Sequence, residues 1–150
     1  MATLVLSYAG SMITQTTPLN ILLVDDAPSV RQALRWLVEE IPGFQVVGEA
    51  ADGETAVQLC HDLLPDVVVL DIDLPHKNGF RVTRLLKETM PQIHVVVLSG
   101  HGDGATRQLA ADVGADAFVE KSDGWQALLA ELENAFARNS INKEVADYTD

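Results

Sequence analysis

The chain has 150 residues and a formal net charge of −12, from 10 Lys and Arg against 22 Asp and Glu. This balance argues against direct nucleic-acid binding, because that function needs a basic surface to displace counterions from phosphates. Hydrophobic residues make up 47% of the chain, but no unbroken apolar run approaches the ~20 residues of a membrane span. A single cysteine excludes an internal disulfide, and no Lys or Arg precedes Arg31. We therefore expect no secretory signal and predict a cytoplasmic protein.

The chain divides by composition into a leader, one domain and a tail. Residues 1–18 are mostly small or polar, which predicts a flexible N-terminal leader. Residues 19–137 alternate apolar runs with helical patterns and are long enough to bury a core. Residues 138–150 are polar and show no periodicity, so we predict a frayed C-terminal tail.

Five short apolar runs, rich in β-branched residues, are predicted to be strands. They lie at 19–24, 44–50, 67–70, 94–98 and 117–120. Continuous runs of this length are typical of strands that are covered on both faces, as in a parallel sheet.

Helical patterns fill the intervals between these runs. In the first interval, apolar residues recur every three or four positions from Val30 to Ile41, after Pro28 and before Pro42-Gly43. Further stripes cover 56–64 and 125–136, and weaker ones 79–89 and 103–113. Five strand–helix repeats predict a single doubly wound α/β domain.

Residues that can carry chemistry stand at the C-terminal ends of four of the runs. They are Asp25, Asp26, Asp71, Ser99 and Lys121. The C-terminal ends of parallel strands line one edge of an open sheet, where ligands bind, so these side chains are expected to meet. Two unit charges ~4 Å apart repel by roughly 4 kcal/mol at an effective dielectric of about 20. Three carboxylates with one lysine would therefore raise their pKa values or bind a metal. Carboxylate oxygens favour Mg²⁺, which predicts metal-assisted phosphoryl chemistry.

Each of these residues also has an ordinary structural interpretation. Asp25 and Asp26 could cap a helix, and Asp71 could be a loop carboxylate. Ser99 precedes Gly100 in a common turn pair, and Lys121 could be a solvated surface lysine. Their coincidence at strand ends favours a common site.

Five motifs, in order, resemble the receiver domain of bacterial two-component response regulators over about residues 19–137. They are Leu22-Leu-Val-Asp-Asp26, Pro65-Asp66-Val-Val-Val-Leu-Asp71, Leu74-Pro75-His-Lys-Asn-Gly79, Val95-Val-Val-Leu-Ser-Gly100 and Gly114-Ala-Asp-Ala-Phe118-Val-Glu-Lys121. The resemblance implies a flavodoxin-like, chemotaxis-regulator-like fold, with a five-stranded parallel sheet in strand order 2-1-3-4-5 and five helices. In style the sequence is most similar to nitrate-response-type receivers.

The resemblance also implies a phosphorylation-activated switch. Asp71 would accept a phosphoryl group from a sensor histidine kinase or a phosphotransfer protein, with Mg²⁺ or Mn²⁺ as cofactor. Asp26, Asp71 and the backbone carbonyl of Asp73 would bind the metal, and Asp25 would act through water. Such a protein would not be an enzyme, beyond catalysing its own phosphorylation and dephosphorylation.

The same resemblance assigns the switch and the output surface. Lys121 would contact the phosphoryl oxygens, Ser99 would move to hydrogen-bond them, and Phe118 would rotate inward. This movement would change a surface at about 103–137 that binds a downstream protein or a second copy of the chain upon phosphorylation.

Two features differ from the family pattern. Ser122 stands where the family often has proline after the lysine, which concerns loop geometry. Asp73 and His101 flank the site, and we hypothesise that they tune metal affinity or phosphoryl lifetime; alternatively, both are solvated loop residues.

Other functions remain open at this stage. The chain could be the receiver fragment of a DNA-binding transcriptional regulator. Asp71-Ile-Asp73 also resembles the nucleophile motif of haloacid-dehalogenase-type phosphatases, although the order of the acidic motifs differs. Elsewhere, Cys60 and Trp125 are expected to pack in the core, whereas Trp36 could mark a partner surface or flank the core.

Overall fold

The computed structural model describes residues 3–5 and 14–149, with side chains described for 17–76 and 79–139. Five parallel strands form the main sheet: β3 (Leu19–Val24), β4 (Phe44–Ala50), β5 (Val67–Asp71), β6 (His94–Ser99) and β7 (Ala117–Glu120). Their spatial order is β4-β3-β5-β6-β7, which confirms the predicted order 2-1-3-4-5 for these strands.

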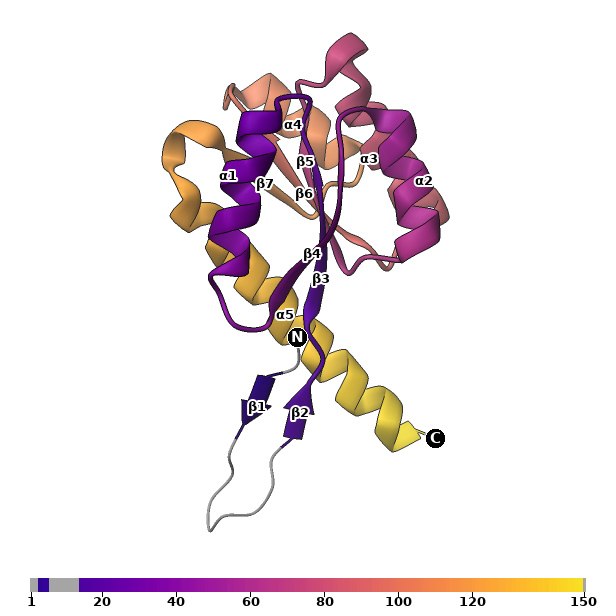
Figure 1. Ribbon diagram of the computed structural model, residues 1–150. Coiled ribbons are helices and arrows are strands. Elements are labelled where there is room, and N and C mark those ends of the chain that lie inside the picture. The colour runs from indigo at the N-terminus through magenta and orange to yellow at the C-terminus, as the bar shows by residue number, and fades with distance from the viewer. Residues whose placement is uncertain (1–2, 6–13, 150) are drawn as a thin grey trace.

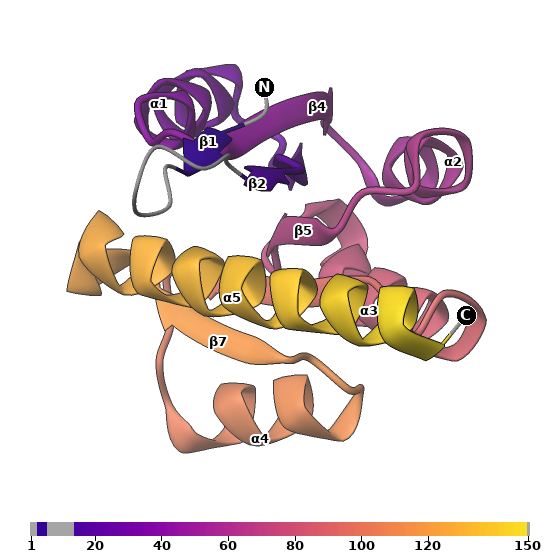
Figure 2. The same ribbon diagram turned by 90° about the horizontal axis from the view of Figure 1, so that it is seen from below.

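Among the described residues, five α-helices pack around the sheet, and Figure 1 shows their arrangement. They are α1 (Pro28–Glu39), α2 (Gly53–Leu63), α3 (Asn78–Thr89), α4 (Gly104–Asp112) and α5 (Trp125–Thr149). Figure 2 shows β7 lying between α4 and α5, so these two helices cover opposite faces of the sheet at this edge. No helix within the described residues is long and apolar enough to cross a bilayer.

Two apolar clusters, one on each face, form the core. Alternate residues of β3 belong to different clusters, Leu22 and Val24 to one and Ile21 and Leu23 to the other, as the two-residue period of a strand requires. The first cluster includes residues of α2, α3 and α4, and the second includes residues of α1 and α5. Burial on both faces explains why the strands read as continuous apolar runs.

The structure differs from the sequence prediction at both ends of the chain. Within the predicted flexible leader, β1 (Thr3–Val5) and β2 (Thr14–Thr16) pair as an antiparallel two-stranded sheet, and both segments contain β-branched residues, which favour strands. Within the predicted frayed tail, α5 continues as helix to Thr149. No Gly or Pro follows Gly124 to stop this helix. The division into leader, domain and tail stays a prediction.

The ends of β5 and β6 place the chemistry-bearing residues. Each strand is one residue longer than predicted, because Asp71 pairs with Leu98 and Ser99 pairs with Glu120. Asp71 and Ser99 are therefore the last strand residues themselves and share the rigidity of the sheet.

Candidate functional site

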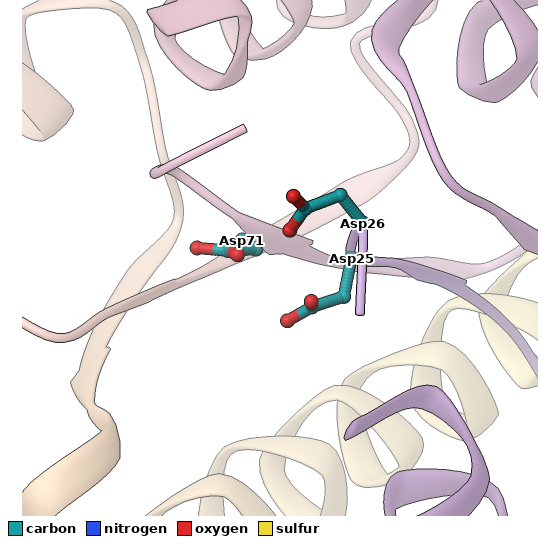
Figure 3. A group of neighbouring side chains, drawn as sticks. All are labelled: Asp25, Asp26 and Asp71. Carbon is teal, nitrogen blue, oxygen red and sulfur yellow. The ribbon is translucent and has the colours of Figure 1, made fainter. Parts of the chain in front are cut away.

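Three carboxylates gather at the C-terminal edge of the sheet (Figure 3). Asp71 ends β5, and Asp25 and Asp26 directly follow the neighbouring strand β3. Asp25 and Asp71 are only 1% and 3% exposed, whereas Asp26 is exposed. One oxygen from each carboxylate lies within 4.8 Å of the others. The structure thus brings together the acidic residues that the sequence predicted to meet.

Lys121 supplies the positive charge at this edge. Its Nζ lies 3.3 Å from Oδ2 of Asp25 and 3.3 Å from Oδ2 of Asp71. Burial lowers the pKa of Lys121, but the two carboxylates outweigh burial, and the net pKa is raised. Lys121 therefore stays protonated and acts as a fixed cation.

The pKa of Asp71 is raised above its ordinary value. Burial is the largest cause, and the charge of Asp25 acts in the same direction. A hydrogen bond from the backbone N–H of Asp73 to Oδ1 of Asp71 (2.9 Å) and the ammonium of Lys121 oppose this shift without cancelling it. Asp71 is thus a carboxyl group whose charge is incompletely compensated by the protein.

Asp25 is held by groups from α1, although it does not cap that helix. Its Oδ1 accepts a hydrogen bond from the backbone N–H of Ala27 (2.9 Å), and its backbone carbonyl accepts one from Nη1 of Arg31 (2.6 Å). The cap residue of α1 is Ala27, which makes no side-chain capping bond. Arg31 also pairs with Glu49 on β4 at 3.1 Å, a supporting contact that the sequence analysis missed.

The donor set fits a hard divalent cation. Three carboxylates face one ammonium, so the cluster keeps net negative charge, and its ligand atoms are all carboxylate oxygens. In the part of the chain that was described, this is the one group of acidic, His or Cys residues spaced to hold a metal. The predicted roles of the Asp73 carbonyl and of a water on Asp25 stay predictions.

Ser99 is fully buried at the end of β6, and its hydroxyl is engaged within its own loop. Its Oγ donates to the carbonyl of His101 (2.9 Å) and accepts from the N–H of His101 (3.0 Å). Asp73 connects the loop after Asp71 to the loop after Ser99, because its Oδ2 accepts a hydrogen bond from the backbone N–H of Gly100 (3.2 Å). The side chains of Asp73 and His101 are exposed.

Phe118 is half-buried and packs against the cluster shared by α2, α3 and α4. The guanidinium of Arg107 on α4 lies over its ring, 4.6 Å from the centroid. Arg107 was not predicted from the sequence, because nothing in the pattern of this short helix distinguishes it from a solvated arginine.

Three further residues were assigned from sequence. Cys60 is buried, and burial raises the pKa of its thiol to about 11, which confirms a packing role. Trp125 packs against the cluster shared by α1 and α5. Trp36 is 67% exposed on α1, so it does not flank the core.

Comparison with known proteins gives one family. The family model "Response regulator receiver domain" matches residues 21–133. The response regulator UvrY of Escherichia coli is 30% identical over 119 residues, which is 79% of this chain and 55% of that protein. The nitrate/nitrite response regulator NarL of Escherichia coli is 33% identical over 127 residues, 85% of this chain and 59% of that protein.

A solved structure agrees with these matches. The crystal structure of a two-component response regulator of the LuxR family from Aurantimonas superposes with a TM-score of 0.76 at 32% identity, covering 87% of this chain and 99% of that one. The chain spans a little over half the length of the two curated relatives named above.

Proposed function

This chain belongs to the response regulator receiver domain family, the phosphorylation-activated switches of two-component systems, and on that premise we propose that Asp71 is its phosphoacceptor. The environment of Asp71 supports this role. Asp71 ends a central strand, and it shares the ammonium of Lys121 with Asp25. A carboxylate with incompletely compensated charge at an open edge of the sheet is well placed to act as a nucleophile.

The proposed transfer is a displacement at phosphorus. A carboxylate oxygen of Asp71 forms a bond to the phosphorus of a phosphohistidine on a sensor kinase or phosphotransfer protein. The phosphorus–nitrogen bond breaks, and its electron pair stays on the imidazole. The product is an aspartyl phosphate, and Lys121 holds the phosphoryl oxygens as a fixed cation.

We propose that Asp26, Asp71 and the backbone carbonyl of Asp73 hold Mg²⁺ or Mn²⁺, with Asp25 acting through water. The spacing of the three carboxylates supports this assignment. When bound, the cation neutralises charge on the carboxylates and on the incoming phosphoryl group.

The proposed switch couples this site to the surface at about 103–137. Ser99 exchanges its bonds with the backbone of His101 for a bond to the phosphoryl group, and Phe118 moves inward. A downstream protein or a second copy of the chain then binds the altered surface. The acidic charge of the chain supports a protein partner rather than direct contact with nucleic acid, and we place the exchange in the cytoplasm.

We also propose that Asp73 and His101 tune the lifetime of the phosphoryl group. The contact of Asp73 with Gly100 supports this role, because it joins the loop after Asp71 to the loop after Ser99. Rates of dephosphorylation of Asp73→Asn and His101→Ala, compared with the parent, test it, and unchanged rates would contradict it.

The deciding experiment is intact mass after incubation with acetyl phosphate and Mg²⁺, beside an Asp71→Asn control. We expect one base-labile phosphoryl adduct, absent from the control and absent without Mg²⁺. An adduct that persists in Asp71→Asn would overturn the assignment. Sustained turnover of a generic aryl phosphate would instead favour the phosphatase alternative.

A further inference from the structure

Arg107 on α4 contacts three separate parts of the chain with one guanidinium group. Its Nε donates to the carbonyl of Gly102 (3.1 Å), and its Nη2 donates to Oε2 of Glu120 (3.0 Å). Its Cζ lies 4.6 Å from the ring centroid of Phe118, within the range of a cation–π contact. The planar, multi-donor geometry of arginine suits such a three-way contact.

These partners lie in or beside the loop that follows Ser99. Phe118 and Glu120 are two residues apart on β7, so both side chains lie on the face that α4 covers. Glu120 pairs with Ser99 across the two strands, and Gly102 is the third residue after Ser99. Arg107 therefore ties the loop after Ser99 to the ring of Phe118 and to the strand end just before Lys121.

We propose that Arg107 is a positioning residue that holds Phe118 in its present half-buried position and so opposes the switch. This inference rests on the proposed function, in which the ring moves inward after phosphorylation of Asp71. Inward rotation carries the ring away from the guanidinium, whereas the ion pair with Glu120 keeps Arg107 beside β7. Inward rotation would thus remove the ring contact of the present arrangement, and its loss must be offset by the phosphoryl group.

The side chain of Arg107 is 44% exposed, so its removal leaves no buried cavity and spares the core. Removing it acts on the balance between the present position of the Phe118 ring and the inward position. That balance can be measured without a kinase, because beryllofluoride with Mg²⁺ mimics a phosphoryl group on a carboxylate.

The test measures the apparent dissociation constant for beryllofluoride, in Mg²⁺, on the whole chain. We expect Arg107→Ala to bind about two- to fivefold more tightly than the parent, the ratio that an exposed cation–π contact is worth. The double variant Arg107→Ala/Phe118→Leu should have the same dissociation constant as Phe118→Leu alone. Glu120→Gln removes the charge of the ion pair but leaves Arg107 an oxygen acceptor and its aromatic partner, and should change the constant less than Arg107→Ala does.

A second readout follows the free protein. In ¹H–¹⁵N spectra without beryllofluoride, the amide signals of Ser99 and Gly100 in Arg107→Ala should lie displaced toward their positions in the bound parent. Arg107→Lys keeps the charge but not the planar group and serves as a control for a folding defect. Its Ser99 and Gly100 signals should lie between those of the free parent and those of Arg107→Ala.

The outcomes separate this inference from the proposed function. Equal or weaker binding by Arg107→Ala, or the same change in the Phe118→Leu background, overturns the role of Arg107 while leaving Asp71 as acceptor. No binding by the parent, or equal binding by Asp71→Asn, overturns the proposed function and this inference with it.

Discussion

The ammonium of Lys121 lies 3.3 Å from a carboxylate oxygen of Asp25 and 3.3 Å from one of Asp71, so two buried acids share one cation. Among the described residues, no other lysine or arginine forms an ion pair with either acid. Folding therefore assembles a site that is electrostatically incomplete until a divalent cation or a proton arrives.

Lys121→Met keeps most of the apolar stem and removes the charge. We expect the free energy of unfolding at neutral pH to fall by about 1–3 kcal/mol, because two buried carboxylates lose their common partner. This range is below that for a fully buried pair, because the side chain of Lys121 is 29% exposed. Urea denaturation measures the change, which should shrink in acid as Asp71 binds a proton.

Lys87→Met is the matched control for Lys121→Met. Lys87 pairs with Asp116 at 2.8 Å and donates to the backbone carbonyls of Pro91 and Ile93, outside the acidic cluster. We expect it to lose stability without altering phosphoryl uptake, whereas Lys121→Met should lose both. Parental stability of Lys121→Met at neutral pH would contradict the shared-cation description.

Asp71→Asn is expected to stabilise the metal-free protein at neutral pH. Burial and the charge of Asp25 raise the pKa of Asp71, so the folded state holds this proton more tightly than the unfolded chain does. The resulting stability is fully present below the unfolded pKa and is lost as pH rises through the folded pKa. Asparagine does not ionise, so Asp71→Asn avoids this loss of stability at neutral pH. We expect its free energy of unfolding, measured by urea denaturation with a chelator, to exceed that of the parent by an amount on the order of 1 kcal/mol.

The pH and metal dependence check this prediction. The difference between Asp71→Asn and the parent should shrink below the ordinary carboxyl range, where the parent holds its proton in both states. Saturating Mg²⁺ should favour the parent, since binding to the folded state stabilises it. A parent more stable than Asp71→Asn in chelator at neutral pH would contradict the raised pKa.

The five strands and the acidic cluster were predictable because their signals are local. Strands buried on both faces require continuous apolar runs, and the runs at 67–70 and 94–98 end within one residue of the observed strands. Asp71 and Ser99 stand directly at those ends, so the general rule about strand C-termini was enough to bring them to one edge.

The contacts of Arg31 and Arg107 were not predictable in the same way. Each is a long side chain on a helix, and its partners come from other elements: Glu49 on β4 for Arg31, and Phe118 on β7 for Arg107. The direction of such a side chain depends on how the helix packs against the sheet. The spacing of residues along the chain does not predict that direction. The helix beyond residue 138 was missed because polar and charged residues dominate that segment and hide the few apolar positions among them.

Cys60 is expected to be inert to thiol reagents in the folded protein. It is fully buried on α2, and burial raises the pKa of its thiol to about 11, so little thiolate forms at pH 8 and a reagent has no access. Labelling with a chromogenic disulfide should be slow in buffer and complete in urea. A Cys60→Ala control should give no signal, and labelling in buffer as fast as in urea would point to an accessible thiol.

The start of α3 approaches the loop after Asp71 closely at Gly79. A Cβ on Gly79 would lie 2.5 Å from Cα and 2.7 Å from the carbonyl oxygen of Ile72. Both neighbours are backbone atoms, so the start of α3 and the loop must separate. We expect Gly79→Ala to lower the free energy of unfolding by about 1–3 kcal/mol. Because Ile72 lies between Asp71 and Asp73, phosphoryl uptake should also slow.

Gly104→Ala provides the comparison that isolates this steric effect. A Cβ at Gly104, the first residue of α4, meets no atom within 4 Å. The same change of residue should there stabilise the protein by about 0.5–1 kcal/mol, since alanine restricts the unfolded chain more than glycine does. Urea denaturation and acetyl phosphate labelling of both variants separate the two cases. Equal stability of Gly79→Ala and Gly104→Ala would mean that the loop between β5 and α3 can move to accommodate the added methyl group. The placement of Asp73 beside Asp71 would then depend on the hydrogen bonds of Asp73 alone.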